Sequence, residues 1–297
     1  MTPHANTVLF LGVSTTASGT AKLWPRWMEA IGIDARLEGV DLPLDSPPHE
    51  YRRFVRRLQN EPGIAGAVIT SHKLDLYRSC SDLLPLADPL VEVMGEAACI
   101  ARGTNGLEAH TVDPLSSRRA LHEMLKARSG KVDDALVLGA GGAGLAVALA
   151  LPDLSKGRVT VADTRPERLE HAAQVFARMS QAGSITTATI PPGAEADELV
   201  GSLPPGSLIV NATGLGKDLP GSPVTDAVAW PEGSLLWELN YRGDLTMLKQ
   251  AGGRAAERSL EIHDGWRLFM HGWALSLSLI FDLEVSADDL ERVSDRP

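Results

Sequence analysis

The chain has 297 residues, a length that suggests two domains of about 150 residues each. Its apolar fraction of 44% and charged fraction of 22% are those of an ordinary folded protein, and its formal net charge of −10 argues against a nucleic-acid surface. The N-terminus lacks a signal-peptide pattern and no stretch approaches about 18 uninterrupted apolar residues, so we expect a cytoplasmic protein without a membrane partner. Cys80 and Cys99 lie outside any CxxC or Cys/His spacing, so neither a disulfide framework nor a metal site is expected.

The first third of the chain alternates strand-like apolar runs with helical patterns. In chain order, these stretches are 7–12, 23–31, 36–42, 51–58 and 64–70. The alternation predicts an α/β unit with a parallel sheet. A helical pattern follows over 74–94 and is broken at Pro85 and Pro89.

Two further runs, 97–102 and 107–111, flank Gly103-Thr104-Asn105-Gly106. Asn-Gly between apolar runs is a strong hairpin signal, so we expect these two strands to pair. Asp113 and Pro114 then open a helix over 115–128, with the aspartate at the N-cap and the proline at the first helical position.

Residues 135–144 carry the most specific pattern in the chain. The run Ala135-Leu136-Val137-Leu138 predicts a buried strand, and Gly139-x-Gly141-x-x-Gly144 follows it at the start of an apolar helix. Glycines at this spacing allow a tight turn, a close approach of backbone to pyrophosphate and close helix-on-strand packing. The next predicted strand ends in Asp163, about 20 residues on, where an acid holds a ribose 2′-hydroxyl. The pattern therefore predicts a dinucleotide-binding domain rather than a glycine-rich turn that binds nothing.

The second half of the chain continues the alternation. Helical patterns cover 166–181, 194–203, 246–252 and 264–283, and strand-like runs cover 185–190, 207–211, 234–239 and 260–262. The acidic tail after the last helix is expected to fray.

Five motifs follow one another along the chain. Ser18-Gly19-Thr20 follows the first strand, Val68-Ile69-Thr70-Ser71-His72-Lys73 ends the third, and Thr111-Val112-Asp113 precedes the helix that links the domains. Asn211-Ala212-Thr213-Gly214-Leu215-Gly216 and Glu238-Leu239-Asn240-Tyr241-Arg242-Gly243-Asp244-Leu245-Thr246 follow later strands. Their order resembles the shikimate dehydrogenase family, whose motifs at these places are SxS, V-T-x-P-x-K, N-T-D, N-A-T-x-x-G and D-x-x-Y-x-P-x-x-T. The resemblance covers nearly the whole chain.

The resemblance implies an α/β fold of two domains. Residues 1–113 with 264–297 would form the substrate-binding domain around a parallel-type sheet, with the C-terminal helix returning to it, and residues 114–263 would form a Rossmann NAD(P)-binding domain. It also implies a catalytic pair, Lys73 and Asp113. Hydride transfer at a carbinol carbon requires a proton to leave or reach the oxygen, which a lysine can relay beside an orienting aspartate. The alternatives are a surface lysine and a simple helix cap.

The predicted binding residues divide into two sets. Those for the substrate are Ser18, Thr20, Thr70, Thr111, Tyr241 and His271. Those for the cofactor are Gly139, Ala140, Gly141, Gly142, Ala143, Gly144, Asp163, Thr164, Arg165, Asn211, Ala212, Thr213, Gly214 and Leu239. For His271, Trp266 and Trp273, which are candidates for new pocket walls, a core position is favoured over a pocket wall.

The cofactor predicted from Asp163 is NAD, because a carboxylate accepts ribose hydroxyls and repels a 2′-phosphate. Family members selective for NADP carry an N-R-T/S pattern where this chain has Asp163-Thr164-Arg165. NADP remains the alternative, since Arg165 or Arg168 can reach a phosphate.

The substrate side departs from the family pattern at three polar positions. An ungapped match places Ile69 at the family threonine, Ala98 at the asparagine and Gly272 at the glutamine. A site that loses such hydrogen bonds discriminates strongly against a hydroxylated ring. We therefore expect a dehydrogenase that acts on a small cyclic acid other than shikimate.

Three alternatives remain open at this point. They are a true shikimate or quinate dehydrogenase, a non-catalytic dinucleotide-binding sensor, and a methylene-tetrahydrofolate-type dehydrogenase. Retention of Lys73 and Asp113 argues against the sensor, and the Asn211 and Tyr241 motifs argue against the third. A homodimer is a further hypothesis.

Overall fold

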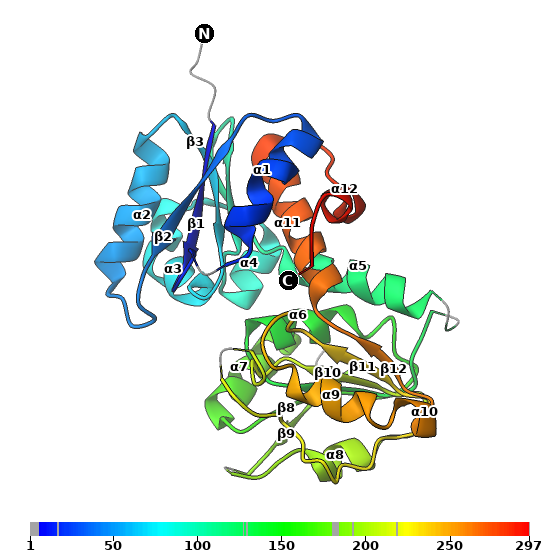
Figure 1. Cartoon of the computed structure of the whole chain (residues 1–297). Helices are drawn as coiled ribbons and strands as arrows, with labels where there is room; N and C mark the ends of the chain where they lie inside the picture. The colour runs from blue at the N-terminus through cyan, green and yellow to red at the C-terminus, as the bar shows by residue number, and fades with distance from the viewer. Residues whose placement is uncertain are drawn as a thin grey trace. The chain divides into compact units, whose positions relative to one another are not determined.

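The computed structural model describes residues 6–16, 18–126, 128, 130–179, 184–191, 193–217 and 219–296. The chain forms two compact units (Figure 1). The first unit comprises Met1–Val112 and Met270–Pro297, and the second comprises Asp113–Phe269. The chain therefore leaves the first unit and returns to it near its C-terminus.

The first unit is built on a six-stranded sheet in the order β2-β1-β3-β5-β6-β4. Its strands are β1 (Thr7–Gly12), β2 (Arg36–Asp41), β3 (Ile64–Ile69), β4 (Leu86–Ala87), β5 (Cys99–Gly103) and β6 (Gly106–His110). β1 runs parallel to β2 and β3, as predicted, whereas β5 runs antiparallel to both β3 and β6. The β5–β6 hairpin predicted from Asn-Gly is confirmed.

Helices cover this sheet. Their apolar residues recur at helical spacing and so form one face, which is buried against the strands. The helices are α1 (Thr20–Ile31), α2 (Pro48–Asn60), α3 (Lys73–Cys80), η1 (Ser81–Leu83), α4 (Pro89–Met94), α12 (Ala287–Arg292) and, from Met270 onward, α11 (Trp266–Phe281). In α2, Tyr51, Phe54, Val55 and Leu58 form one buried stripe and pack into the same core cluster as Leu9 of β1. The prediction of helix throughout 74–94 is wrong at β4, where Leu86 and Ala87 pair in parallel with β6.

The C-terminal residues complete the first unit. Trp273 of α11 packs against Phe10, Trp24 and Trp27, with ring centroids 5.4, 6.0 and 5.4 Å away. The prediction that the tail frays is wrong over α12. Ser286 caps this helix and Leu290 is buried, because an N-terminal capping box and one apolar anchor stabilise even a short helix.

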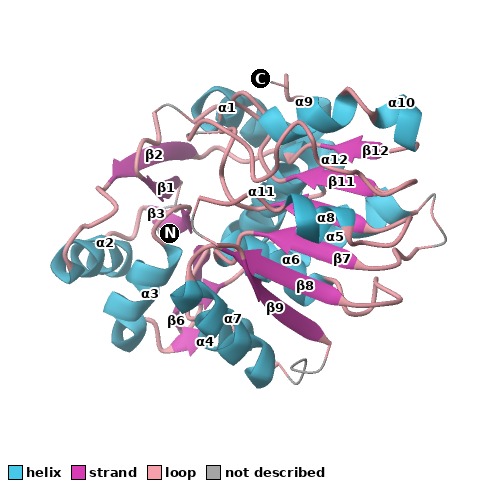
Figure 2. Cartoon of the chain, turned by 90° about the horizontal axis from the view of Figure 1, so that it is seen from below, coloured by secondary structure: helices cyan, strands magenta, loops and turns pink. Residues whose placement is uncertain are grey.

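The second unit is built on six strands in the order β12-β11-β10-β7-β8-β9. They are β7 (Ala135–Leu138), β8 (Val159–Asp163), β9 (Ile185–Thr189), β10 (Leu208–Asn211), β11 (Leu235–Glu238) and β12 (Glu261–His263). All neighbours pair in parallel, and Figure 2 shows the strands side by side. The strand order reverses at β7, so the sheet is a Rossmann fold with its crevice at the carboxyl ends of β7 and β10.

The helices of the second unit are α5 (Asp113–Leu125), α6 (Gly142–Ala150), α7 (Pro166–Arg178), α8 (Asp197–Gly201), α9 (Thr246–Gly252) and α10 (Ala255–Arg258). The helix predicted over 194–203 is therefore shorter, and α10 was not predicted. The predicted end of the helix 166–181 lies outside the described residues. The fully buried strands explain the near-continuous apolar runs of the sequence, as expected of a sheet covered on both faces.

Candidate functional site

Three glycines shape the turn between β7 and α6. Gly139 has φ +105°, and a Cβ there would lie 2.7 Å from the Ala212 carbonyl oxygen. A Cβ at Gly144 would lie 1.9 Å from the Gly139 carbonyl oxygen, so neither position admits a side chain. Gly141 differs, because its Cβ would meet only the Arg168 Nη1 atom at 3.8 Å. The first two glycines are therefore required for packing, whereas Gly141 leaves open space before α6.

The open space at Gly141 fits a dinucleotide. Gly141 is the N-cap of α6, whose first-turn N–H groups have no acceptor within the helix. Such a helix end, next to a turn without side chains, is suited to a pyrophosphate. The predicted residues Gly142 and Ala143 lie in this first turn.

Besides the cofactor contact predicted for it, Asp163 has a structural role that the sequence pattern did not reveal. Its carboxylate accepts hydrogen bonds from the backbone N–H of Ala140 at 2.8 Å and of Arg165 at 2.9 Å. Arg168 Nη1 lies 3.6 Å from the same carboxylate. Asp163 thus holds the glycine turn to the end of β8, while Thr164 and Arg165 are exposed beside it.

The loop after β10 is fixed by side-chain hydrogen bonds. Asn211 Oδ1 accepts from the N–H of Thr213 at 3.1 Å and from its hydroxyl at 2.7 Å. Gly214 follows with φ +81°, and a Cβ there would meet no atom within 4 Å. Ala212 packs on Gly139, so the predicted cofactor residues of the two loops lie together at the carboxyl edge of the sheet.

Glu238, at the end of β11, is a buried residue that the motif contained but to which no role was assigned. It accepts hydrogen bonds from Asn211 and Asn240. Burial raises the pKa of Glu238 to about 7, against the opposing effect of these hydrogen bonds. Leu239 follows it, and its N–H donates to the Asn211 carbonyl oxygen at 3.1 Å.

Tyr241 belongs to an aromatic cluster within the second unit. Its ring centroid lies 4.5 Å from that of Phe269 and 5.7 Å from that of Trp266. Trp266 is buried in this cluster, which agrees with the core position favoured for it.

In the first unit, the predicted substrate residues share one edge of the sheet. Because β1 and β3 are parallel, the residues that follow them, Ser18, Thr20, Thr70 and Lys73, lie at the same edge. β5 is antiparallel to both β3 and β6, so β6 runs in the same direction as β3 and ends at the same edge. Thr111 directly follows β6. Backbone bonds join these ends: the Thr70 N–H donates to Leu11, and the Ile69 N–H to Ala98.

Two hydroxyls of the loop after β1 are bonded to each other. The Ser18 hydroxyl donates to the Thr20 hydroxyl oxygen at 2.8 Å. Thr20 is fully buried, whereas Ser18 is half-buried. Of the two, Ser18 is therefore the group that a ligand reaches first.

Lys73 follows a buried histidine that connects three segments. His72 is fully buried, and its Nδ1 lies 3.0 Å from the Tyr51 hydroxyl of α2. Its Nε2 lies 3.0 Å from the Leu42 carbonyl oxygen, just after β2. The Leu42 carbonyl oxygen can only accept, so Nε2 donates to it, and in the neutral ring Nδ1 then accepts from the Tyr51 hydroxyl. Lys73 then opens α3 from a fixed starting point.

Thr111 has a partner that the sequence pattern did not reveal. Its hydroxyl donates to Glu96 Oε1 at 3.1 Å, and both residues are buried. No spacing in the sequence marks Glu96, because it reaches Thr111 only through the antiparallel pairing of β5 with β6.

The three departures from the family pattern occupy distinct environments. Ile69 and Ala98 are buried at the ends of neighbouring strands. Gly272 lies within α11, where a Cβ would meet no atom within 4 Å. His271, next to it, is buried, and its assignment to the substrate stays a prediction. Trp273 packs in the core of the first unit, as favoured.

Lys73 belongs to the first unit, and Asp113 begins the second as the first residue of α5. Both residues are half-buried. Their assignment as a catalytic pair stays a prediction.

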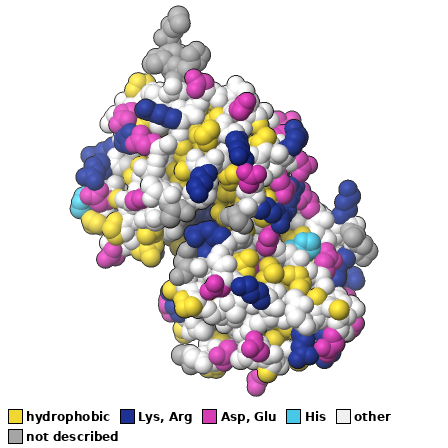
Figure 3. Space-filling model, viewed as in Figure 1, with side chains coloured by type: hydrophobic (Ala, Val, Ile, Leu, Met, Phe, Trp, Pro, Cys, Tyr) yellow, Lys and Arg dark blue, Asp and Glu magenta, His cyan; other side chains and the backbone are white. Residues whose placement is uncertain are grey.

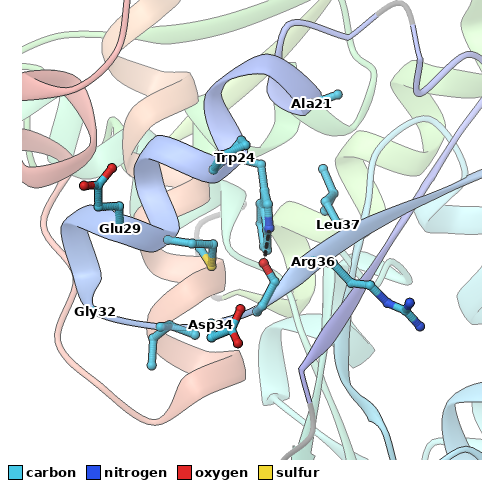
Figure 4. A pocket seen from close by; sticks show the side chains of 11 residues that line it. Ala21, Trp24, Glu29, Gly32, Asp34, Arg36 and Leu37 are labelled. Atoms are coloured by element: carbon cyan, nitrogen blue, oxygen red, sulfur yellow. Dashed lines mark hydrogen bonds between the residues drawn. The ribbon is translucent and has the colours of Figure 1, made fainter.

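A groove of about 690 Å³ lies between the end of α1 and the start of β2 (Figure 4). Trp24 Nε1 donates to the Ala35 carbonyl oxygen at 2.8 Å on its wall. Because it adjoins the first residues of β2, this groove is at the opposite edge of the sheet from Lys73.

Among the described residues, no helix combines the length and the hydrophobicity that a membrane span requires. The same residues include no group of three or more His, Cys, Asp or Glu that could hold a metal ion. Basic and acidic side chains are interspersed over the face seen in Figure 3.

A Rossmann sheet with this glycine turn, in a chain with a second α/β unit, is typical of NAD(P)-dependent dehydrogenases. No model of a protein family matches the chain. It is 30% identical to the shikimate dehydrogenase (NADP⁺) of Acidiphilium cryptum over 257 residues, 81% of this chain and 83% of the relative. It is 29% identical to that of Paramagnetospirillum magneticum over 262 residues, 88% and 87% of the two chains. The chain belongs to the shikimate dehydrogenase family.

The fold agrees with this membership. The quinate dehydrogenase of Corynebacterium glutamicum, solved in complex with NAD, superposes with a TM-score of 0.76 at 19% identity. The match covers 98% of this chain and 99% of that one. The protein is an NAD(P)-dependent oxidoreductase of the shikimate dehydrogenase family that acts on a CH–OH group.

Proposed function

We propose that this enzyme prefers NAD and acts on a ring carbinol or ketone of a small cyclic acid other than shikimate. The observation that carries the proposal is the loss of three polar groups, at Ile69, Ala98 and Gly272. Burial of an unpaired hydroxyl costs roughly 1–3 kcal/mol. Three such losses would lower the affinity for shikimate by orders of magnitude.

The space at Gly272 supports a bulkier or less hydroxylated ring. No atom lies within 4 Å of an added Cβ at this position. An aliphatic ring substituent would gain from contact with Ile69 and Ala98, whereas a hydroxyl would lose its water there.

The proposed chemistry divides between the cofactor and the chain. The dinucleotide supplies the hydride acceptor or donor. Lys73 binds the reacting oxygen and exchanges its proton, and Asp113 orients the substrate hydroxyl and Lys73. Ser18 binds the ring carboxylate by turning its single hydroxyl proton from Thr20, its acceptor in this structure, to the ligand. Thr70, Thr111, Tyr241 and His271 complete the proposed substrate site.

The cofactor preference is proposed from the end of β8. Thr164 stands where the family pattern for NADP has arginine, and the Asp163 carboxylate beside it is negative. A 2′-phosphate would meet this carboxylate at close range and in a poorly hydrated place, which disfavours NADP. The curated relatives are named as NADP⁺ enzymes, so this preference separates the chain from them.

The substrate proposal is tested with purified enzyme, NAD, and a panel of shikimate, quinate and their deoxy and amino analogues. We expect the highest kcat/KM with a less hydroxylated ring. The variant Ala98→Asn, which restores the family side chain, should raise the kcat/KM for shikimate relative to that for the best substrate. Shikimate turnover at about 10⁴ M⁻¹s⁻¹ or above in the unchanged protein would refute the proposal and favour a true shikimate dehydrogenase.

The cofactor proposal is tested by kinetics with NAD and NADP. We expect NAD to give the higher kcat/KM, and Thr164→Arg to raise the NADP value while Thr164→Ala, the matched control, does not. A higher value with NADP in the unchanged protein would refute it. The homodimer and the cytoplasmic location stay predictions.

A further inference from the structure

The carboxyl of Glu238 takes no part in the chemistry proposed above, yet its side chain is fully buried at the carboxyl edge of the Rossmann sheet. Its Oε2 accepts from Asn211 Nδ2 at 2.5 Å. Its Oε1 accepts from the backbone N–H of Asn240 at 2.9 Å and from Asn240 Nδ2 at 2.7 Å. A buried carboxyl with three donors is costly to place and requires an explanation.

The direction of each hydrogen bond is fixed. Asn211 Oδ1 accepts from the backbone N–H of Thr213, a group that can only donate, so Asn211 Nδ2 must face Glu238. The Asn240 backbone N–H can also only donate. Both carboxyl oxygens therefore face donors. An ionised carboxylate satisfies them all, whereas a proton would have to share Oε2 with the Asn211 bond.

The same two asparagines hold the loops that follow β10 and β11. Asn211 Nδ2 and Asn240 Nδ2 both donate to the Leu215 carbonyl oxygen, at 3.4 and 3.3 Å. The Thr213 hydroxyl in turn accepts from the Leu215 N–H at 3.2 Å. Glu238 is thus the common acceptor that joins the loop 212–216 to the loop 239–241.

The position of these loops indicates which part of the dinucleotide they serve. Asp163 marks the adenosine half at the end of β8, on one side of the strand-order reversal at β7. The other half of a bound dinucleotide would lie over β10 and β11, because dinucleotides cross the crevice at this reversal. Ala212 packs on Gly139, which makes the loop 212–216 one wall of that crevice.

We propose that Glu238 is a positioning residue for the nicotinamide half of the cofactor, and that it acts as a carboxylate that holds both loops through Asn211 and Asn240. This inference rests on the proposed function of the glycine turn as a dinucleotide site. Protonation of the Glu238 carboxylate would then weaken its hold on the loops 212–216 and 239–241. The pKa of Glu238, raised by burial to about 7, puts the loss of its charge near neutral pH. Asn211 at the end of β10 and Asn240 in the loop after β11 face this carboxyl, and both are neutral; their hydrogen bonds lower its pKa, while burial raises it by more.

The test compares NAD with ADP, a probe that lacks the nicotinamide half, in titrations of the full chain between pH 5.5 and 8.5. The variants are Glu238→Gln, which keeps the shape, and Glu238→Asp, which keeps the charge and is the residue of the family motif. Glu261→Gln is the matched control, because Glu261 is a half-buried carboxyl at the amino end of β12, the strand next to β11. Unfolding temperatures of all variants are recorded alongside.

At pH 8 we expect Glu238→Gln to weaken NAD about tenfold, the loss of one hydrogen bond to a charged group, with ADP unchanged within about twofold. Glu238→Asp should keep most of the NAD affinity of the unchanged protein. Glu261→Gln should leave the affinities for NAD and ADP unchanged. NAD affinity of the unchanged protein should fall as the pH falls through about 7, and Glu238→Gln should abolish this dependence.

Two results would overturn the inference: equal affinity of Glu238→Gln and the unchanged protein for NAD at every pH, or equal loss of NAD and ADP. Failure of the unchanged protein to bind either nucleotide would instead refute the dinucleotide site itself.

Discussion

Lys73 and Asp113 are the residues on which the proposed chemistry depends, and in that proposal they serve one proton transfer. Lys73→Ala and Asp113→Asn should each lower kcat by about 10²–10⁴-fold while the Kd for NAD stays nearly unchanged. The double variant should be little worse than either single one, because both groups serve the same step. Steady-state kinetics and NAD titration measure this. Small losses that add up would place the chemistry on other residues.

The buried carboxyl of Glu238 also predicts how stability depends on pH. Its pKa is about 7 in the folded protein, above its ordinary value of 4.5, so the folded chain binds more protons between these values. Its contribution to the free energy of unfolding is therefore complete below pH 4.5 and is lost as the pH rises through 7. It amounts to about 3 kcal/mol.

Urea unfolding of the unchanged protein and of Glu238→Gln at pH 5 and pH 8 measures this contribution. We expect the variant to lose the decline in stability that this carboxyl causes between the two pH values. Parallel pH profiles for the two proteins would show that Glu238 ionises in the folded state as it does in the unfolded chain.

At the scale of elements, the turn between β7 and α6 separates two uses of glycine. Gly141→Ala should fold normally, because its Cβ meets only Arg168 Nη1 at 3.8 Å, yet should bind NAD poorly because the methyl occupies the ligand's space. Gly144→Ala should lower the unfolding temperature itself, because its Cβ would lie 1.9 Å from the Gly139 carbonyl oxygen. Thermal unfolding and NAD titration distinguish the two. Equal loss of stability in both variants would contradict this division.

The same turn shows which elements could be predicted from the sequence. Strand, glycine spacing and helix are local in the chain, so residues 135–144 specified β7, the turn and α6 together. The hairpin β5–β6 was also local, through Asn105-Gly106. β4 and α12 were missed because their stability comes from partners distant in sequence: β4 pairs with β6, and Leu290 of α12 is buried by tertiary packing.

The candidate site was predictable only where a motif is continuous. Ser18, Lys73 and Asn211 stand in short motifs, and they could be named without a structure. Glu96 and the hydrogen bonds of Asp163 and Glu238 could not, since their partners come from other strands and depend on sheet order. A carboxylate in a sequence gives no sign of whether water or buried amides will surround it.

At the scale of the whole molecule, the two cysteines of the first unit report on its integrity. Cys80 and Cys99 are fully buried, and burial raises their thiol pKa values to about 11 and about 12. Neither thiol should react with a disulfide reagent at pH 8 in the folded protein, since the reactive thiolate is scarce and covered. Both should react in step with unfolding by urea. Rapid labelling of either cysteine without urea would show local opening of this unit.

The return of the chain to its first unit has a consequence for biosynthesis. The residues that close that unit, among them Trp273 against Phe10 and Ile280 over Gly66, are made after the whole second unit. The second unit, by contrast, is continuous from Asp113 to Phe269. Domains of most chains fold in the order in which they leave the ribosome. Here the second unit can fold first, while the strands of the first unit keep an uncovered apolar face until the residues from Met270 onward have been synthesised.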